Sequence, residues 1–141
     1  MLLIIYIIYV TYCLLEKYYS YSLKACVKIT TGSESYNDGY LQVSMNGNVK
    51  ANGKYGKGDV VIGSTCLVSL KTLTLKNSKS DAWVGKVEIK VNGKLVSINC
   101  VGCTGLSSLQ DGFIVVDGNS DSEKQSETHC LNGATCSLTW E

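Results

Sequence analysis

The sequence predicts an all-β protein: an antiparallel β-sandwich of about eight strands, stabilised by disulfides and preceded by an N-terminal signal peptide. Three observations predict this class. From residue 23 onward, apolar and polar residues alternate with a period of two, the period of a half-buried strand. Asn-Gly and Asp-Gly pairs, which favour tight hairpin turns, separate the alternating runs. Six of the seven cysteines follow the N-terminal apolar run, and an even set is typical of a disulfide framework in an exported chain.

The N-terminal segment reads MLLIIYIIYVTYCLL, an almost continuous apolar run. It is shorter than the about 20 apolar residues of a membrane helix and fits the roughly 7 to 15 of a secretory signal. A Ser-Tyr-Ser triplet at residues 20–22 supplies a small-x-small cleavage pattern. We therefore expect a signal peptide at residues 1–22 and one secreted domain at residues 23–141. No Lys or Arg precedes the apolar run, which leaves an uncleaved anchor or a buried N-terminal element as the alternative.

Removal of the leader would take Cys13 with it and leave an even set of cysteines. These disulfide candidates are Cys26, Cys66, Cys100, Cys103, Cys130 and Cys136. They predict up to three disulfides, whose pairing the sequence leaves open. Because only two residues separate Cys100 from Cys103, we expect these two to bridge to different partners. Together with His129 the same cysteines have the composition of a zinc site, and the C-x-x-C has that of a redox pair. Both alternatives are less favoured, because a zinc site needs reduced thiols and a redox pair needs a helix that is not predicted.

The predicted strands lie between Gly-containing turns. They cover residues 24–30, 40–45, 60–63, 66–76, 83–91, 95–101, 113–116 and 134–140. The predicted turn pairs are residues 38–39, 46–47, 52–53, 92–93, 111–112 and 132–133.

The clearest predicted hairpin is WVGKVEIKV-NG-KLVSINCV. A turn at residues 92–93 would place Ile89 opposite Val96 and keep one face of both arms apolar. In the run 66–76 the apolar phase changes partway along, so we expect a bulge or a turn near Lys71.

Two stretches carry a resemblance to a known family. The run CVKITTGSESYNDGYLQVSMNG resembles the opening of a PLAT/LH2 domain, the β-sandwich of lipoxygenases, lipases and polycystins. The later run VSLKTLTLKNSKSDAWVGKVEIKVNGK is similar to that family's strand, polar turn and Asp-x-Trp strand. The resemblance covers residues 26–103 and implies that Trp83 is a core residue. Ser33 stands where the family often has an acidic residue after Thr-Gly, which weakens the implication of calcium binding more than that of the fold.

A second acidic segment begins like a calcium loop. Oxygen-bearing side chains occupy alternate positions at Asp117, Asn119, Asp121 and Glu123. The sixth and twelfth positions of such a loop should be Gly and Glu, but here they are Ser122 and Thr128. A solvated connection is the preferred interpretation, and a weak calcium site, helped by Glu34 or Asp38, is the alternative. No other cofactor is expected.

A further candidate is a basic and aromatic tip formed by two loops. Its ligand-contact residues would be Tyr36, Tyr40, Lys50, Lys54, Tyr55 and Lys57. Lysines and tyrosine rings at one end of a sandwich suit lipid headgroups or anionic glycan. The alternative is an ordinary solvated loop.

Composition narrows the function classes. All 13 basic residues are Lys and the formal net charge is +1, which argues against a nucleic-acid binder. A single histidine and no recognisable catalytic pattern argue against an enzyme. We expect a secreted, non-catalytic binding or adhesion module that contacts lipid, glycan or protein through its loops. The alternative is a structural subunit of an extracellular filament or coat, a homopolymer assembled by β-strand complementation. A disulfide-rich inhibitor or toxin scaffold is a third class.

Overall fold

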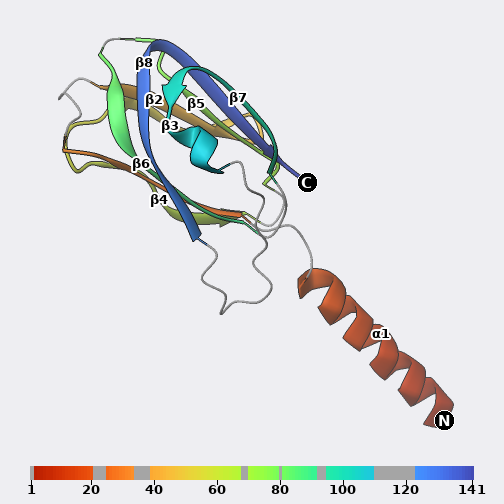
Figure 1. Cartoon of the computed structure of the whole chain (residues 1–141). Coiled ribbons are helices and arrows are strands. Elements are labelled where there is room, and N and C mark those ends of the chain that lie inside the picture. The colour runs from red at the N-terminus through yellow and green to blue at the C-terminus, as the bar shows by residue number, and fades with distance from the viewer. Residues whose placement is uncertain are drawn as a thin grey trace.

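The described residues of the computed structural model form an N-terminal helix, a 3₁₀ helix and eight antiparallel strands in two layers (Figure 1). It describes residues 2–20, 25–33, 39–67, 70–79, 81–91, 95–109 and 123–141. The elements are α1 (Leu2–Ser20), β1 (Ala25–Thr31), β2 (Tyr40–Met45), β3 (Asn48–Lys54), β4 (Val60–Leu67), β5 (Thr72–Lys76), β6 (Trp83–Val91), β7 (Leu95–Thr104), the 3₁₀ helix η1 (Leu106–Leu109) and β8 (Glu123–Trp140). The prediction of an all-β antiparallel sandwich with eight strands is confirmed.

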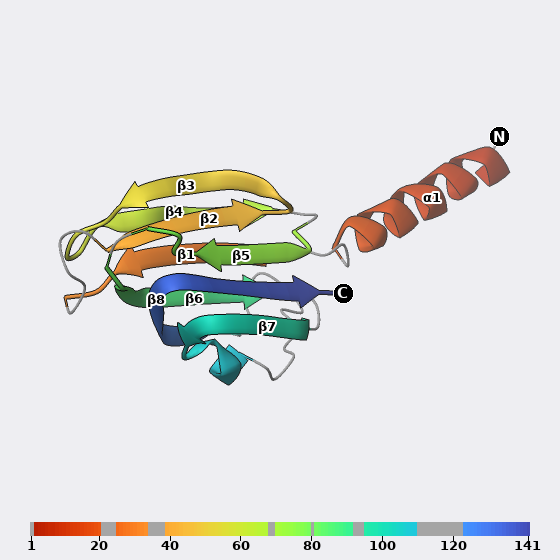
Figure 2. The ribbon, with the colours of Figure 1, turned by 90° about the horizontal axis from the view of Figure 1, so that it is seen from above.

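Strand β8 belongs to both layers of the sandwich. Its first half pairs with β6 and its second half pairs with β5, while β7 runs along its opposite edge. One layer therefore has the order β3-β2-β5-β8-β7, and the other has the order β8-β6-β1-β4. The outer strands β3 and β4 approach each other on the far side (Figure 2), so the two layers form one nearly closed sheet.

The side chain and backbone of Asn77 hold the point where β8 crosses between the layers. Asn77 is fully buried in the connection from β5 to β6. Its backbone N–H donates to the carbonyl of Ala134 at 2.9 Å, and its carbonyl accepts from the N–H of Gly133 at 2.7 Å. Its side-chain Nδ2 donates to the carbonyls of Cys130 and Asp81. Gly133 has a φ of 88°, a conformation that glycine adopts without strain and that lets β8 turn here.

The core lies between the layers and contains the inward, alternate residues of the strands. Trp83 is fully buried in it, as predicted, and its Nε1 donates to Thr31 Oγ1 at 3.1 Å. This bond satisfies the one polar group of the indole, which would otherwise be costly to bury. The Trp83 ring lies over Gly85, two residues along the same face, where no side chain is in the way.

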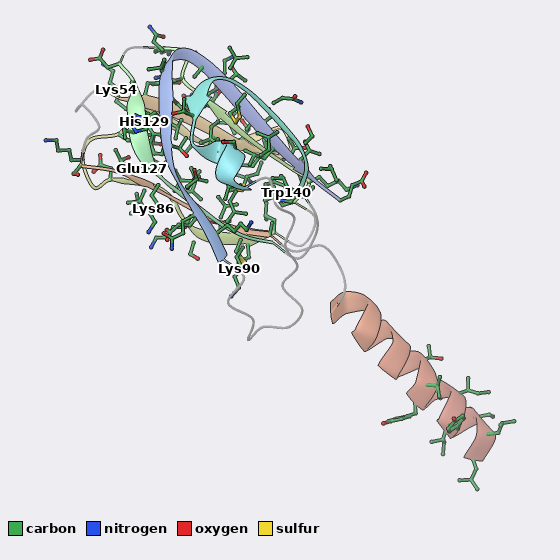
Figure 3. All side chains as sticks on the ribbon, viewed as in Figure 1. Lys54, Lys86, Lys90, Glu127, His129 and Trp140 are labelled. Atoms are coloured by element: carbon green, nitrogen blue, oxygen red, sulfur yellow. A yellow bond between two sulfur atoms is a disulfide. The ribbon has the colours of Figure 1, made fainter. Side chains whose placement is uncertain are left out.

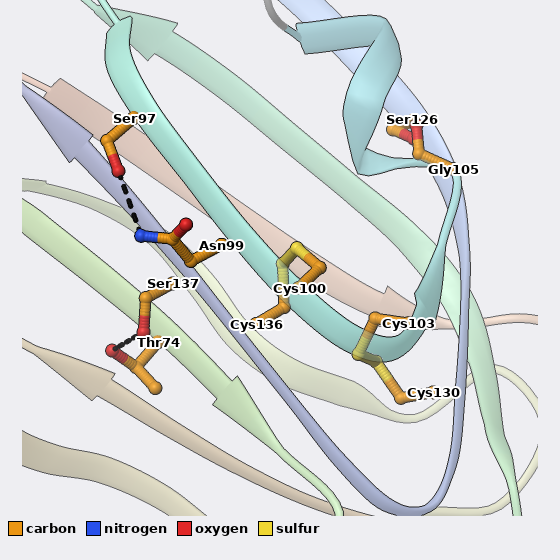
Figure 4. Close-up of a disulfide and its surroundings, with 10 residues drawn as sticks. All are labelled: Thr74, Ser97, Asn99, Cys100, Cys103, Gly105, Ser126, Cys130, Cys136 and Ser137. Atoms are coloured by element: carbon orange, nitrogen blue, oxygen red, sulfur yellow. Dashed lines mark hydrogen bonds between the residues drawn. A yellow bond between two sulfur atoms is a disulfide. The ribbon is translucent and has the colours of Figure 1, made fainter.

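Three disulfides join neighbouring strands. Cys26–Cys66 joins β1 to β4, and two more, Cys100–Cys136 and Cys103–Cys130, join β7 to β8 (Figure 4). All six predicted cysteines are paired, and Cys100 and Cys103 bridge to different partners as expected. The disulfide interpretation of the C-x-x-C is thus confirmed. The two bridges to β7 start from β8 on either side of the crossing point, at residues 130 and 136.

The predicted hairpin between residues 83–91 and 95–101 is wrong. Both strands exist, but β6 pairs with β1 and β8 on its two edges, and β7 pairs with β8. Strand β8 lies between the two arms. The apolar faces of β6 and β7 have matching phases, but they match β8 equally well, and the phase of a strand does not specify its neighbour.

The predicted turns have mixed outcomes. Residues 46–47 form the β2–β3 turn, with positive φ at both Asn46 and Gly47. Residues 52–53 do not form a turn, because they lie inside β3, a strand that the sequence analysis missed. The chain does leave the sheet near Lys71, between β4 and β5. The predicted strand 113–116 and the turns at 92–93 and 111–112 lie outside the described residues, as does Asp38 of the pair 38–39.

The helix α1 covers most of the segment predicted to be a signal peptide. Its apolar side chains from Leu2 to Val10 are exposed, and the helix stands away from the sandwich (Figure 1). Within the described part of the chain, no helix combines the length and hydropathy needed to cross a membrane. Cleavage after residue 22 stays a prediction.

We expect Gly85→Ala to destabilise the protein. A Cβ at this position would collide with the indole of Trp83 and the backbone carbonyl of Thr30. Overpacking of this kind costs about 1–3 kcal/mol of unfolding free energy, measured by urea denaturation. The matched control is Gly63→Ala in β4, where nothing lies within 4 Å of the added methyl. Equal stability of the two variants would contradict this packing of Trp83.

We expect Asn77→Ala to cost at least about 2 kcal/mol of unfolding free energy, because it removes the side-chain donor to the buried carbonyl of Cys130 in β8 and to the carbonyl of Asp81 in the β5–β6 connection. Asn132→Ala, at an exposed position in the same crossing, serves as the control and should change stability by less than about 0.5 kcal/mol. Thermal unfolding of both variants measures the difference. A harmless Asn77→Ala would show that the crossing does not depend on this side chain.

Candidate functional site

The predicted tip exists in part, at the end of the sandwich where β2 begins and β3 ends. Tyr40 lies opposite Lys54 in the β2–β3 pairing, and the backbone N–H of Tyr55 donates to the carbonyl of Gly39 at 2.8 Å. Lys79, which the sequence analysis did not select, places its Nζ 5.5 Å from the centroid of the Tyr40 ring. The tip therefore combines β3, the β3–β4 loop and the β5–β6 connection.

The aromatic rings of this tip face the protein more than the solvent. Tyr40 is only 6% exposed and its hydroxyl donates to Asn52 Oδ1. Tyr55 is partly buried and packs against the core. Both rings therefore support β3 and leave little surface for a ligand. Tyr36 lies outside the described residues.

The lysines of the tip are exposed but accompanied by acidic groups. Lys54 ends β3 and Lys57 lies in the following turn, whereas Lys50 sits four residues back along β3. Asp59 is in the same turn, where its Oδ2 accepts from the N–H of Gly56 at 2.8 Å. Asp81 lies at the same end, since its carbonyl accepts from the N–H of Tyr40. With Lys79 the tip has four lysines, and two aspartates offset half of their charge. Binding to an anionic membrane rests on clusters of about 4–8 basic residues, so the tip lies at the low end of that range.

The candidate calcium ligands cannot be placed as a set. Asp117, Asn119 and Asp121 lie outside the described residues, as do Glu34 and Asp38. Glu123 is the first residue of β8, opposite Lys90 of β6. In the described part of the chain, no group of three or more His, Cys, Asp or Glu side chains is arranged to hold a metal ion.

A further candidate site is a surface groove on the outer face of the β1-β6-β8 layer. It has a volume of about 400 Å³, within the range of small-ligand sites. It is lined by Gly32, Ser33, Val84, Gly85, Lys86, Gln125 and Glu127. The Gly32 N–H donates to the carbonyl of Val84 at 2.9 Å. Because Gly32 has no side chain, the surface beside Val84 is hollow.

Alternation along β6 and β8 places the polar side chains of the groove on one face. Lys86 is directly opposite Glu127 in the antiparallel pairing, and Gln125 is opposite Glu88. Figure 3 shows Lys86, Glu127 and His129 on the same side of this layer. Lys86 Nζ also lies 3.4 Å from Glu88 Oε1, with half of the Lys86 side chain exposed. The groove therefore presents the ammonium of Lys86, the amide of Gln125 and the carboxylate of Glu127 on one face.

This groove was not predicted from the sequence, because the first half of β8 was not predicted to be a strand. The inward residues of that half are Ser126 and Thr128, which are buried although they are polar. Their hydroxyls bond to backbone carbonyls, Ser126 to Gly105 and Thr128 to Ser126. The alternation was visible as Gln125, Glu127 and His129 at every second position, but an alternation without apolar residues reads as a solvated segment.

Comparison of the chain with protein-family models finds no match, and comparisons with curated proteins and with solved structures find none either. The resemblance to the PLAT/LH2 family therefore stays a prediction that rests on residues 26–103.

Proposed function

We propose that this protein is a secreted, non-catalytic binding module, and that it binds a neutral, hydroxyl-rich ligand, a glycan, in the groove across β1, β6 and β8. The observation that carries the proposal is the row of Lys86 and Glu127 beside the hollow at Gly32. A sugar ring presents hydroxyls that both donate and accept hydrogen bonds. Adjacent ammonium, amide and carboxylate groups complement both properties.

The charge balance of the groove favours a neutral ligand over an anionic one. Glu127 and Glu88 both lie next to Lys86, so a phosphate or carboxylate there would meet two like charges. Repulsion from these two carboxylates would disfavour the binding of a negatively charged ligand. The tip is not a better site for an anionic headgroup, because the rings of Tyr40 and Tyr55 are mostly covered and Asp59 and Asp81 offset half of the charge of its lysines.

An extracellular location is supported by the disulfides. Three bridges join neighbouring strands, and such bridges persist in oxidising compartments and are rare in the cytosol. The PLAT-like resemblance would also fit a binding module.

We expect the secreted protein to bind neutral oligosaccharides on a glycan array and to bind anionic phosphatidylserine vesicles weakly or not at all. Glu127→Ala and Gln125→Ala should each weaken glycan binding about tenfold or more, because each removes a polar partner from the groove. Thr135→Ala, exposed on the other layer, is the control and should bind like the wild type. The absence of any glycan binding, or binding that the groove variants leave unchanged, would refute the proposal.

A further inference from the structure

Among the described strands of the sandwich, three lie at an edge, and two of these are protected. β3 carries Lys50 and Lys54, and charged side chains on an edge discourage pairing with another chain. β4 approaches β3 across the open side, and its pairing with β1 is irregular near Ile29. Irregularities of this kind also interrupt the straight ladder that a foreign strand would need.

The third edge strand, β7, lacks this protection. Its sequence LVSINCVGCT contains no charged residue. Within the described residues every strand pairing of β7 is with β8, and no described strand lies along its other edge; η1, which follows β7 in the chain, also contacts it. Figure 2 shows β7 at the side of the sandwich opposite β3. Val101 is 76% exposed and Val96 is 45% exposed.

Strand β7 is also fixed to the rest of the sandwich within a single copy. The bridges Cys100–Cys136 and Cys103–Cys130 fix it to β8 (Figure 4). Between its two irregular points β7 pairs regularly with β8 from Ser97 to Val101. A rigid edge loses less conformational entropy when another strand pairs with it.

We propose that β7 is a homodimer interface, at which the β7 strands of two copies pair antiparallel across a two-fold axis. The axis would pass near Asn99, the middle of the regular run, and bring the two Asn99 side chains together. Asn99 is exposed, and its amide can donate and accept at once. Identical strands without charge do not repel, and the whole chain has a net charge of only +1.

This interface closes on itself. Among the described strands each copy has one such edge, and an isologous contact uses it in both copies, so association through β7 stops at two. The free side of the first half of β8 is not a second such edge, because η1 lies beside it and Ser126 Oγ donates to the carbonyl of Gly105 there. The filament considered from sequence would instead require each copy to donate an extended N-terminal segment or an edge strand to the sheet of the next copy. The dimer differs from glycan binding and does not depend on it.

The test is sedimentation equilibrium of the secreted protein over a concentration series. We expect a monomer–dimer equilibrium whose midpoint Asn99→Lys moves at least about tenfold to higher concentration, because it places two like charges at the axis. Val101→Lys, at the most exposed position of β7, is a second variant with the same expected effect. Thr135→Lys is the matched control: it adds the same charge to the same face, but on β8, which has neighbours on both edges.

Three results would overturn the proposal: a wild type that stays monomeric, a dimer that neither edge variant weakens, or a mass that rises beyond two copies. Circular dichroism and thermal unfolding identify a variant that fails to fold, and the other edge variant then decides. A protein that binds glycan but does not dimerise would contradict this proposal alone. A protein that dimerises but binds no glycan would contradict the glycan proposal alone.

Discussion

The crossing of β8 from one layer to the other is the constraint on which the rest of this structure depends. A single strand that pairs with β6 in one layer and β5 in the other must turn between them, and at the turn its backbone groups leave the ladder. Asn77 satisfies these groups with both its backbone and its amide, while Gly133 supplies the backbone conformation. The bridges from Cys130 and Cys136 then fasten β7 on both sides of the same turn. The positions of the groove, of the core and of the edge strand β7 all depend on this crossing.

Sequence could predict the strands whose inward residues are apolar, and it failed where burial is polar or absent. β2 and β6 were predicted with their observed bounds because Leu41, Val43 and Val87 alternate with polar residues. β3 was missed because it is an edge strand with mostly exposed residues, and its Asn52-Gly53 pair is typical of a turn. The first half of β8 was missed because Ser126 and Thr128 are its buried residues. The pairing of the strands could not be predicted. The alternation of apolar and polar residues shows which face of a strand is buried, but not which other strand lies beside it.

The candidate site illustrates the same limit. The tip could be predicted because its residues are close in sequence, at the end of β3 and in the turn that follows. The groove draws on Ser33, Lys86 and Glu127, which come together only through the β1-β6-β8 pairing. The proposed dimer edge uses another strand, β7, so two copies would carry two open grooves. Two linked sites bind a repeating glycan more tightly than one, because the second contact is intramolecular.

Mapping the disulfides of the protein, purified without reductant, by proteolysis and mass spectrometry tests the arrangement around β8 most directly. The account predicts the pairs Cys100–Cys136 and Cys103–Cys130, which require β7 to lie along β8 across the crossing, together with Cys26–Cys66. A bridge between Cys100 and Cys103, a bridge between Cys130 and Cys136, or free thiols at these positions would contradict it.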